Sequence, residues 1–202
     1  MPVFYRTPRM EQPALPPSDE ELVTLTLQER SHYGYLVERY EARLARYIRR
    51  LGVRDPEDQR DVLQEVFIKA YRNLNSFDTK LSFSSWIYRI AHNEAVSWFR
   101  KYKVRPEGHL IADSDEVLAL VGSEEESAAE QFDRSVNAEE VKMALSSIDE
   151  KYRQVLVLRF FEHKEYEEIS DILKLPVGSV GTLIHRGKKQ LAAALNTDAL
   201  RI

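Results

Sequence analysis

The sequence predicts an all-α protein made of two small helical domains joined by an acidic linker. Apolar residues recur at helical spacing in two stretches of the chain, and its 202 residues include only 7 glycines, few for a β-rich fold. Charge is segregated: residues 30–103 carry a net charge of +6, residues 104–140 carry −9, and residues 141–195 carry +2. Two basic blocks separated by an acidic one indicate two anion-binding modules and a linker that repels anions.

The composition is that of a globular chain, with 43% hydrophobic and 31% charged residues. No apolar run approaches the roughly 18 residues of a membrane span, and no signal-peptide pattern is found, so we expect a cytoplasmic protein without membrane insertion. Cysteine is absent, which excludes disulfides and thiolate metal sites. The five histidines share no ligand spacing and no glycine-rich phosphate loop occurs, so we expect no cofactor, no metal and no catalytic site.

The first part of the chain divides into a tail and a series of helices. Residues 1–17 hold five of the eight prolines and are expected to be disordered. Ser18 and Glu21 form a capping-box pattern that predicts the start of a first helix. Apolar spacing predicts a second helix over 33–51, and Pro56 is placed to start a third.

A further helix is predicted from Phe83 to about Lys103, with Ser82 as its cap. It completes a first domain that we place at 18–103. Glu94 falls on the apolar face of this helix, and we expect it to pair with an arginine of the preceding helices.

Residues 104–136 lose helical periodicity and almost all positive charge. They predict an acidic flexible linker, with a short helix around 117–121. Helical spacing returns from Ala138, so we place a second domain at 137–195 and a C-terminal tail at 196–202.

The stretch "YEEISDILKLPVGSVGTLIHRGKKQL", Tyr166–Leu191, predicts two short helices around a sharp turn, with Pro176 in the first turn of the second helix. One face of that second helix is apolar or small, and it holds Val180, Ile184, Gly187 and Leu191. The opposite face is small, polar and basic, which suits a helix lying in a DNA major groove. It holds Gly178, Thr182, His185, Arg186 and Lys189. A helical hairpin with a solvated basic face is the alternative.

The last predicted helix of the first domain mixes aromatic and basic side chains. Arg89, Asn93 and Arg100 form one stripe along it. Aromatic rings offer stacking faces to unpaired bases and cations hold the phosphate backbone, so the mixture predicts contact with single-stranded nucleic acid. Under the alternative interpretation, Trp86 and Trp98 are core residues and the arginines only solubilise the surface.

These stretches resemble a known family. "DVLQEVFIKAYRNLNSFD" at 61–78 and "FSSWIYRIAHNEAVSWFRKYK" at 83–103 resemble region 2 of the extracytoplasmic-function (ECF) sigma factors of bacterial RNA polymerase, a group of the sigma-70 family. "ALSSIDEKYRQVLVLRFFEHKEYEEISDILKLPVGSVGTLIHRGKKQL" at 144–191 resembles their region 4, a helix-turn-helix. The match covers roughly 20–195 in the right order, and the D-x-x-Q-E-x-F and F-x-x-W-x-Y-R-I-A-x-N strings are highly specific together.

The resemblance implies an alternative sigma factor that binds RNA polymerase core, recognises promoter DNA, melts the minus-ten element and starts transcription. Region 2 would dock on the β′ clamp helices of the polymerase, with Asp61, Gln64 and Glu65 as contact residues. It would hold the minus-ten element as single-stranded DNA, with Lys80, Trp86, Arg89, Asn93 and Arg100. Region 4 would meet the β flap and recognise the minus-thirty-five element as duplex DNA, with Ser179, Thr182, His185, Arg186, Lys188 and Lys189. An anti-sigma factor is a candidate further partner.

Several positions depart from the family pattern. Ile148 and Asp149 stand where relatives commonly have leucine and proline, and His163 stands in place of a glycine. Gly181 and Leu183 fall in the recognition helix where many relatives carry arginine. Two explanations for Gly181 stay open. It lets the DNA backbone approach closely, or it is a tolerated loss because region 2 supplies most of the specificity.

Two other classes of function compete with this one. A plain helix-turn-helix repressor or activator explains residues 141–195 but leaves the helices at 61–70 and 83–103 without a role, and copurification with core polymerase separates the two classes. A helical hydrolase would need catalytic carboxylates. Pairs such as Glu124 and Glu126 lie in the predicted linker, where no pocket tunes a catalytic group.

Overall fold

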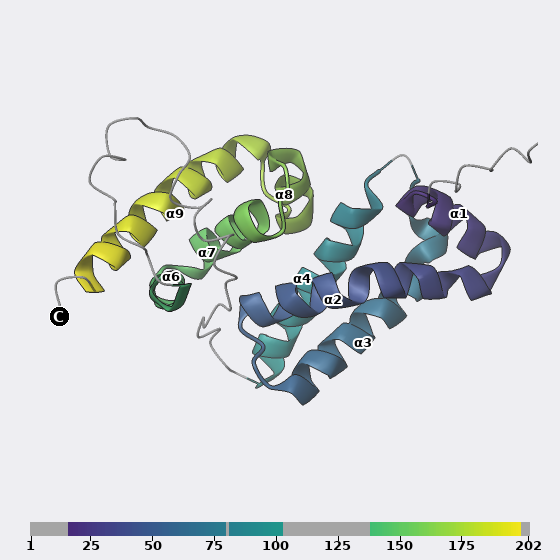
Figure 1. Cartoon of the computed structure of the whole chain (residues 1–202). Coiled ribbons are helices and arrows are strands. Elements are labelled where there is room, and N and C mark those ends of the chain that lie inside the picture. Colours follow the sequence, from purple (N-terminus) through teal and green to yellow (C-terminus); the bar gives the residue numbers. More distant parts are fainter. Residues whose placement is uncertain (1–15, 80, 103–137, 199–202) are drawn as a thin grey trace, which may run out of the picture.

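The computed structural model describes residues 16–79, 81–102 and 138–198, in which every regular element is a helix (Figure 1). The first domain holds α1 (Asp19–Gln28), η1 (Arg30–His32), α2 (Tyr33–Leu51), α3 (Pro56–Asn73), η2 (Leu74–Ser76) and α4 (Phe83–Tyr102). The second holds α6 (Ala138–Ser147), α7 (Glu150–Leu156), the π-helical turn η4 (Val157–Phe161), α8 (Tyr166–Leu173) and α9 (Val177–Asp198). The predicted all-α, two-domain architecture is therefore confirmed. The predictions for most of the tail, for Lys80 and for the linker with its short helix lie outside the described residues.

Local signals set the helix starts in the first domain. Ser18 Oγ accepts a hydrogen bond from the Glu21 N–H at 3.1 Å, and the Glu21 carboxylate accepts one from the Ser18 N–H at 2.7 Å, so the predicted capping box is confirmed. Pro56 occupies the start of α3, as predicted. Ser82 caps α4, because its Oγ accepts from the Ser85 N–H at 3.2 Å.

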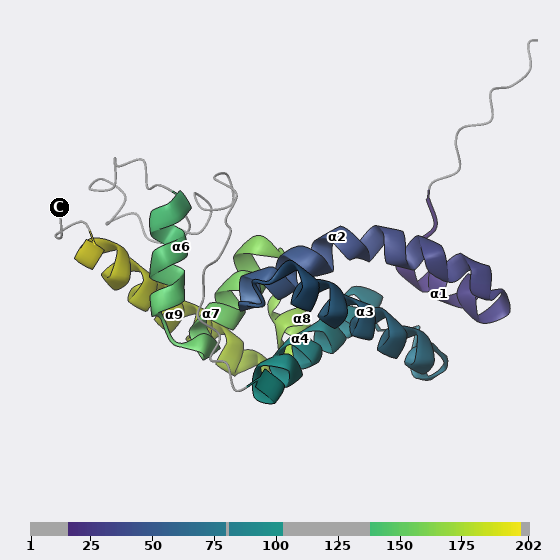
Figure 2. The same ribbon diagram turned by 90° about the horizontal axis from the view of Figure 1, so that it is seen from below.

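The core of the first domain lies between α2, α3 and α4, with α1 packed at one end (Figures 1 and 2). Aromatic rings fill it where α4 begins: the ring centroid of Phe83 lies 5.5 Å from those of both Tyr40 and Phe77. The carboxylate of Glu20 on α1 accepts a hydrogen bond from the Phe83 N–H at 3.1 Å. The start of α4 is therefore held by packing and by a cap from another helix.

The second domain packs α9 against α6, α7 and α8 (Figure 1). Lys174 ends α8 in the left-handed conformation, with a φ of 57°, and this turns the chain toward α9. Pro176 directly precedes α9, which begins at Val177, one residue later than predicted, and the Pro176 carbonyl accepts a hydrogen bond from the Ser179 N–H at 2.8 Å. α9 continues to Asp198, into the segment expected to be a tail, since Leu195 is still buried against the domain.

The two domains contact each other chiefly through α4 and α8 (Figures 1 and 2). The C-terminal end of α2 also reaches the segment that follows η4. This contact brings together parts of the chain that the sequence analysis treated as separate.

Candidate nucleic-acid interface

Helix α3 turns one polar face to solvent. Asp61 lies on that face about one turn before the neighbouring residues Gln64 and Glu65, and all three are exposed. The opposite face enters the core, with Val62 at 5% and Val66 at 0% exposure. A rigid helix thus presents a row of carboxylate and amide groups that is open to a protein partner.

Helix α4 buries its apolar side and turns a polar stripe outward. Asn93 and Arg100 are exposed and Arg89 is half-buried, at spacings that place the three along one side of the helix. The sequence predicted that Glu94 pairs with an arginine, and this prediction is wrong. Glu94 binds Lys69 of α3 at 2.7 Å, because the packing of α3 against α4 brings this cation opposite the carboxylate.

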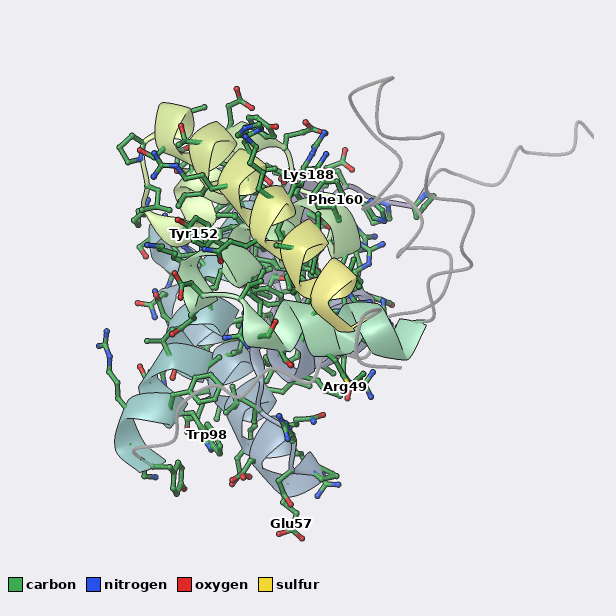
Figure 3. The ribbon with its side chains drawn as sticks, turned by 90° about the vertical axis from the view of Figure 1, so that its left-hand side faces the viewer. Arg49, Glu57, Trp98, Tyr152, Phe160 and Lys188 are labelled. Atoms are coloured by element: carbon green, nitrogen blue, oxygen red, sulfur yellow. The ribbon has the colours of Figure 1, made fainter. Side chains whose placement is uncertain are left out.

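The two tryptophans of α4 are half-buried. The ring centroid of Trp86 lies 5.2 Å from that of Phe77 and 5.6 Å from that of Phe83, and the ring packs against the core. Trp98 lies near the C-terminal end of α4 (Figure 3), with its ring centroid 5.1 Å from that of Tyr102. Among the described residues, its buried indole N–H finds no hydrogen-bond acceptor. Much of each ring therefore serves packing, as the alternative interpretation held.

The predicted anchoring face of α9 is buried in the second domain, and its members are Val180, Ile184, Gly187 and Leu191. Gly187 has a steric reason to be glycine. A Cβ atom there would lie 3.2 Å from Leu156 of α7 and 3.3 Å from Tyr152. The glycine thus allows α9 to approach α7 closely.

The opposite face of α9 is open to solvent. Thr182, His185, Arg186 and Lys189 are exposed, whereas Ser179 and Lys188 are half-buried. The Lys188 ammonium lies 5.1 Å from the ring centroid of Phe160 (Figure 3), a cation–π contact that holds this side chain beside η4.

Gly181 lies next to the ring of Tyr166 at the start of α8. A Cβ atom at this position would lie 3.5 Å from Tyr166 Cε2, which is an ordinary van der Waals distance. The Arg159 guanidinium lies on the same ring, 5.4 Å from its centroid. The protein itself therefore has room for a methyl group at 181.

A polar cluster between the domains was missed by the sequence analysis. Glu162 accepts hydrogen bonds from Arg50 at 2.8 Å and from the Tyr88 hydroxyl at 2.6 Å, and the Arg50 and Glu162 side chains are 3% and 5% exposed. Burial raises the pKa of Glu162, although the Tyr88 hydroxyl and the Arg50 charge oppose the rise. The sequence carries only a weak signal of this cluster. Arg50 follows Tyr47 by three residues, a spacing that places it on the same side of its helix as a residue that proves to be buried.

A second group of contacts flanks this cluster. The Lys164 ammonium donates to Ser84 Oγ at 2.5 Å and to the Glu168 carboxylate at 2.9 Å, and Ser85 Oγ donates to the same carboxylate at 3.2 Å. Burial acts to raise the pKa of Glu168, but the Glu165 N–H and the Lys164 ammonium outweigh it and the pKa is lowered. Residues of α8 and of the loop before it thus form hydrogen bonds with the serine hydroxyls at the start of α4.

Within the described ranges, no group of histidine, aspartate and glutamate side chains could hold a metal ion. No described helix combines the length and the apolar character that crossing a membrane requires. The predicted site residues that the structure describes lie on polar helix faces, and most of them are exposed.

Family models match both domains. The sigma-70 region 2 model matches residues 36–105, and the sigma-70 region 4 model matches residues 138–191. The ECF RNA polymerase sigma factor SigW of Bacillus subtilis is 36% identical over 140 residues, which cover 67% of this chain and 74% of that protein. The ECF RNA polymerase sigma-E factor of Escherichia coli K12 is 33% identical over 187 residues, with 85% and 94% covered.

Solved structures agree. The structure of CnrH in complex with the cytosolic domain of CnrY is similar with a TM-score of 0.64 at 25% identity, covering 89% of this chain and 98% of that one. The sigma factor RpoE of Bartonella quintana, in complex with the anti-sigma factor NepR, shares the fold with a TM-score of 0.56 at 20% identity, with 81% and 98% covered. The chain belongs to the extracytoplasmic-function family of RNA polymerase sigma factors, and as an alternative sigma factor it directs promoter recognition and transcription initiation.

Proposed function

We propose that this sigma factor docks on RNA polymerase core through α3 and guides the enzyme with α4 and α9. The exposed face with Asp61, Gln64 and Glu65 would meet the β′ clamp helices, and region 4 would meet the β flap. The names of the relatives, which are RNA polymerase sigma factors, support this partner. An anti-sigma factor is a second proposed partner, since exposed apolar side chains such as Tyr35 and Leu81, 59% and 57% exposed, offer it contact area.

For the minus-ten element we propose the polar stripe of α4. Asn93 would contact a base and Arg100 would hold the backbone, because the amide can form paired hydrogen bonds and the guanidinium can bind phosphate. Arg89 would contribute from its half-buried position. Lys80 and Trp86 stay proposed members of the same site, with Trp86 offering the accessible part of its ring to a melted base.

For the minus-thirty-five element we propose α9. The short side chains of Ser179, Thr182 and His185 would recognise base edges. The long cations Arg186, Lys188 and Lys189 would hold phosphates, mostly toward the C-terminal half of the helix. A helix face with these short side chains makes fewer bidentate base contacts than an arginine-rich face.

The observation that carries this proposal is the division of α9 into a buried apolar face and an exposed polar, basic face. Run-off transcription with core polymerase on a promoter library identifies the promoter, and a gel-shift titration on its minus-thirty-five duplex then tests the helix. Arg186→Ala should weaken binding by about tenfold, the equivalent of one charged hydrogen bond. Lys151→Ala is the matched control, since Lys151 is an exposed cation on α7 outside the helix-turn-helix. Equal binding by the Arg186→Ala variant and the parent would contradict the placement of α9 in the groove.

Binding to core polymerase tests the rival class of helix-turn-helix regulators. Glu65→Arg should weaken binding to core enzyme without loss of helicity, and Glu41→Arg, on the exposed side of α2, is its control. A parent chain that does not copurify with core polymerase would favour the rival. We also propose a cytoplasmic location and no catalytic activity of its own, both in keeping with a transcription initiation factor.

A further inference from the structure

One of the two groups of polar contacts between the domains converges on a single carboxylate, that of Glu162. Glu162 of region 4 has both oxygens occupied by residues of region 2: Arg50 Nη1 lies 2.8 Å from Oε1, and the Tyr88 hydroxyl lies 2.6 Å from Oε2. The Arg50 guanidinium also lies over the Phe161 ring, 4.8 Å from its centroid. An arginine and a hydroxyl donor converging on a buried carboxylate form an anion-binding site.

Two more arginines extend this site along α2. Arg43 and Arg46 precede Arg50 by seven and four residues, so the three lie on one side of the helix. The positive charge of Arg46 acts on Glu162, and that of Arg43 acts on the Tyr88 hydroxyl. Arg43 and Arg46 are exposed, whereas Arg50 is buried beneath region 4. We call these three arginines the α2 strip.

The closed arrangement cannot span a promoter. The minus-ten and minus-thirty-five elements lie about 25 base pairs apart, or roughly 85 Å at about 3.4 Å per base pair. In the structure, α4 and α9 both contact the same helix, α8, so their nearest parts are separated by little more than one helix diameter of about 10–12 Å. The domains must therefore separate when both elements are bound.

Separation withdraws Glu162 and uncovers Arg50 and Tyr88, beside Arg43 and Arg46, which are already exposed in the closed form. We propose that Arg43, Arg46, Arg50 and Tyr88 form a phosphate-binding site for the backbone of promoter DNA, which Glu162 fills as an internal substitute while the domains are in contact. This inference rests on the proposed role of α4 at the minus-ten element. Domain closure and DNA binding by region 2 are then alternatives, because the same side chains serve both.

The chemistry of the contact suits an exchange of anions. A buried ion pair adds little stability over an apolar pair of similar size, so stability alone is a weak reason for Arg50 and Glu162. An arginine that leaves a carboxylate is satisfied at once by water or by a phosphate. If the contact were apolar, separation of the domains would expose apolar surface to water, which is unfavourable. The ion pair therefore makes the contact reversible.

The test uses the full chain without polymerase and a fluorescent single-stranded oligonucleotide of random sequence. Glu162→Gln keeps the shape of the side chain but removes the carboxylate charge that Arg50 contacts in the closed form. X-ray scattering should show a larger radius of gyration, and fluorescence anisotropy at low salt should show at least about threefold tighter binding, since the binding-competent open form is no longer scarce. Glu167→Gln is the control, because Glu167 is an exposed carboxylate on α8 outside the contact.

A second variant isolates the arginines. Adding Arg43→Gln and Arg46→Gln to the Glu162→Gln chain should abolish the gain and reduce the slope of log K against log salt by about 1.4, for two phosphates on a single strand. Both arginines are exposed, so the variant should keep the helicity of the parent in circular dichroism.

Three outcomes would overturn the inference: a Glu162→Gln chain that stays closed, one that opens without tighter binding, or a gain that survives loss of the arginines. Failure of the parent in run-off transcription would instead refute the proposed function. A parent active in transcription whose oligonucleotide binding ignores these substitutions would refute only the phosphate site.

Discussion

Helices α4 and α9 both turn polar residues outward, but they are held in different ways. α4 packs on two sides, against α2 and α3 of its own domain and against α8 of the other. The main contacts of α9 lie within its own domain, with α6, α7 and α8. In this arrangement the polar face of α9 is open to solvent, whereas α4 is partly covered by the other domain. Perturbations of the two helices should therefore have distinguishable effects.

The largest effect is expected from acid, acting on α4. Burial lowers the pKa of His92 from 6.5 to about 4, and its Nδ1 lies 3.3 Å from the Tyr47 hydroxyl. Between these pH values the unfolded chain binds a proton that the folded chain does not, so stability falls as the pH drops through this window. The loss contributed by His92 reaches at most about 3 kcal/mol near pH 4.

Urea unfolding at several pH values measures this contribution. His92→Gln should flatten the dependence between pH 6.5 and 4. His185→Gln, on the exposed face of α9, should leave it as steep as in the parent. An equally steep dependence in the His92→Gln variant would show that acid does not act through α4.

The next effect concerns the anchor of α9. Gly187→Val places a branched side chain where even a Cβ atom lies 3.2 Å from Leu156. We expect a loss of about 2 kcal/mol in the free energy of unfolding, from overpacking against α7. Gly178→Val is the matched control, since a Cβ atom there has no neighbour within 4 Å in the described structure. Equal losses at 178 and 187 would mean that the close approach of α9 to α7 does not matter.

A smaller effect, of opposite sign, is expected on the same helix. Gly181→Ala should raise the free energy of unfolding by up to about 1 kcal/mol, because alanine favours the helix and the new methyl meets Tyr166 at an ordinary distance. Because the methyl lies against that ring, we expect equal or tighter binding to minus-thirty-five duplex DNA in a gel-shift titration. Weaker binding would instead favour the explanation that DNA approaches the backbone at Gly181.

The smallest effect is expected in the loop that presents region 4 to α4. His163 has a φ of 50°, in the left-handed region that favours glycine. His163→Gly should relieve about 1–2 kcal/mol of strain and cost about 0.5–1 kcal/mol of chain entropy, a net gain of roughly 0.5 kcal/mol in urea unfolding. Lys174→Gly, where φ is 57°, should behave alike. Destabilisation in both variants would show that this conformation carries no strain.

Local signals in the sequence predicted most of the helices. The capping box at Ser18, the proline at 56 and the apolar spacing over 33–51 act within a few residues of the features they specify, and the structure confirms them. The predicted partner of Glu94 was wrong, because the partner depends on which residue of α3 the packing places opposite Glu94. That residue is Lys69. Helical spacing shows which face is buried but not what lies across from it.

The candidate site shows the same limit. The exposure of Asn93, Arg100 and Arg186 follows from their positions opposite apolar faces. Trp86 and Lys188 are less accessible, because each packs against a ring outside its own helix, Phe77 and Phe160 respectively. Helical spacing within one segment does not show these contacts. The contact between the domains was not predicted, since Arg50 and Glu162 are 112 residues apart and helical spacing does not show contacts between distant segments.

The buried ion pair between Arg50 and Glu162 also constrains how the protein can evolve. Loss of either charge removes the ion pair while the other charge stays buried, a change worth several kcal/mol in a contact with side chains 3% and 5% exposed. The two positions should therefore change together, so that among orthologues a neutral residue at 50 is accompanied by a neutral residue at 162. Covariation between these distant positions would record the contact in sequences alone, and independent drift would mean that selection does not maintain it.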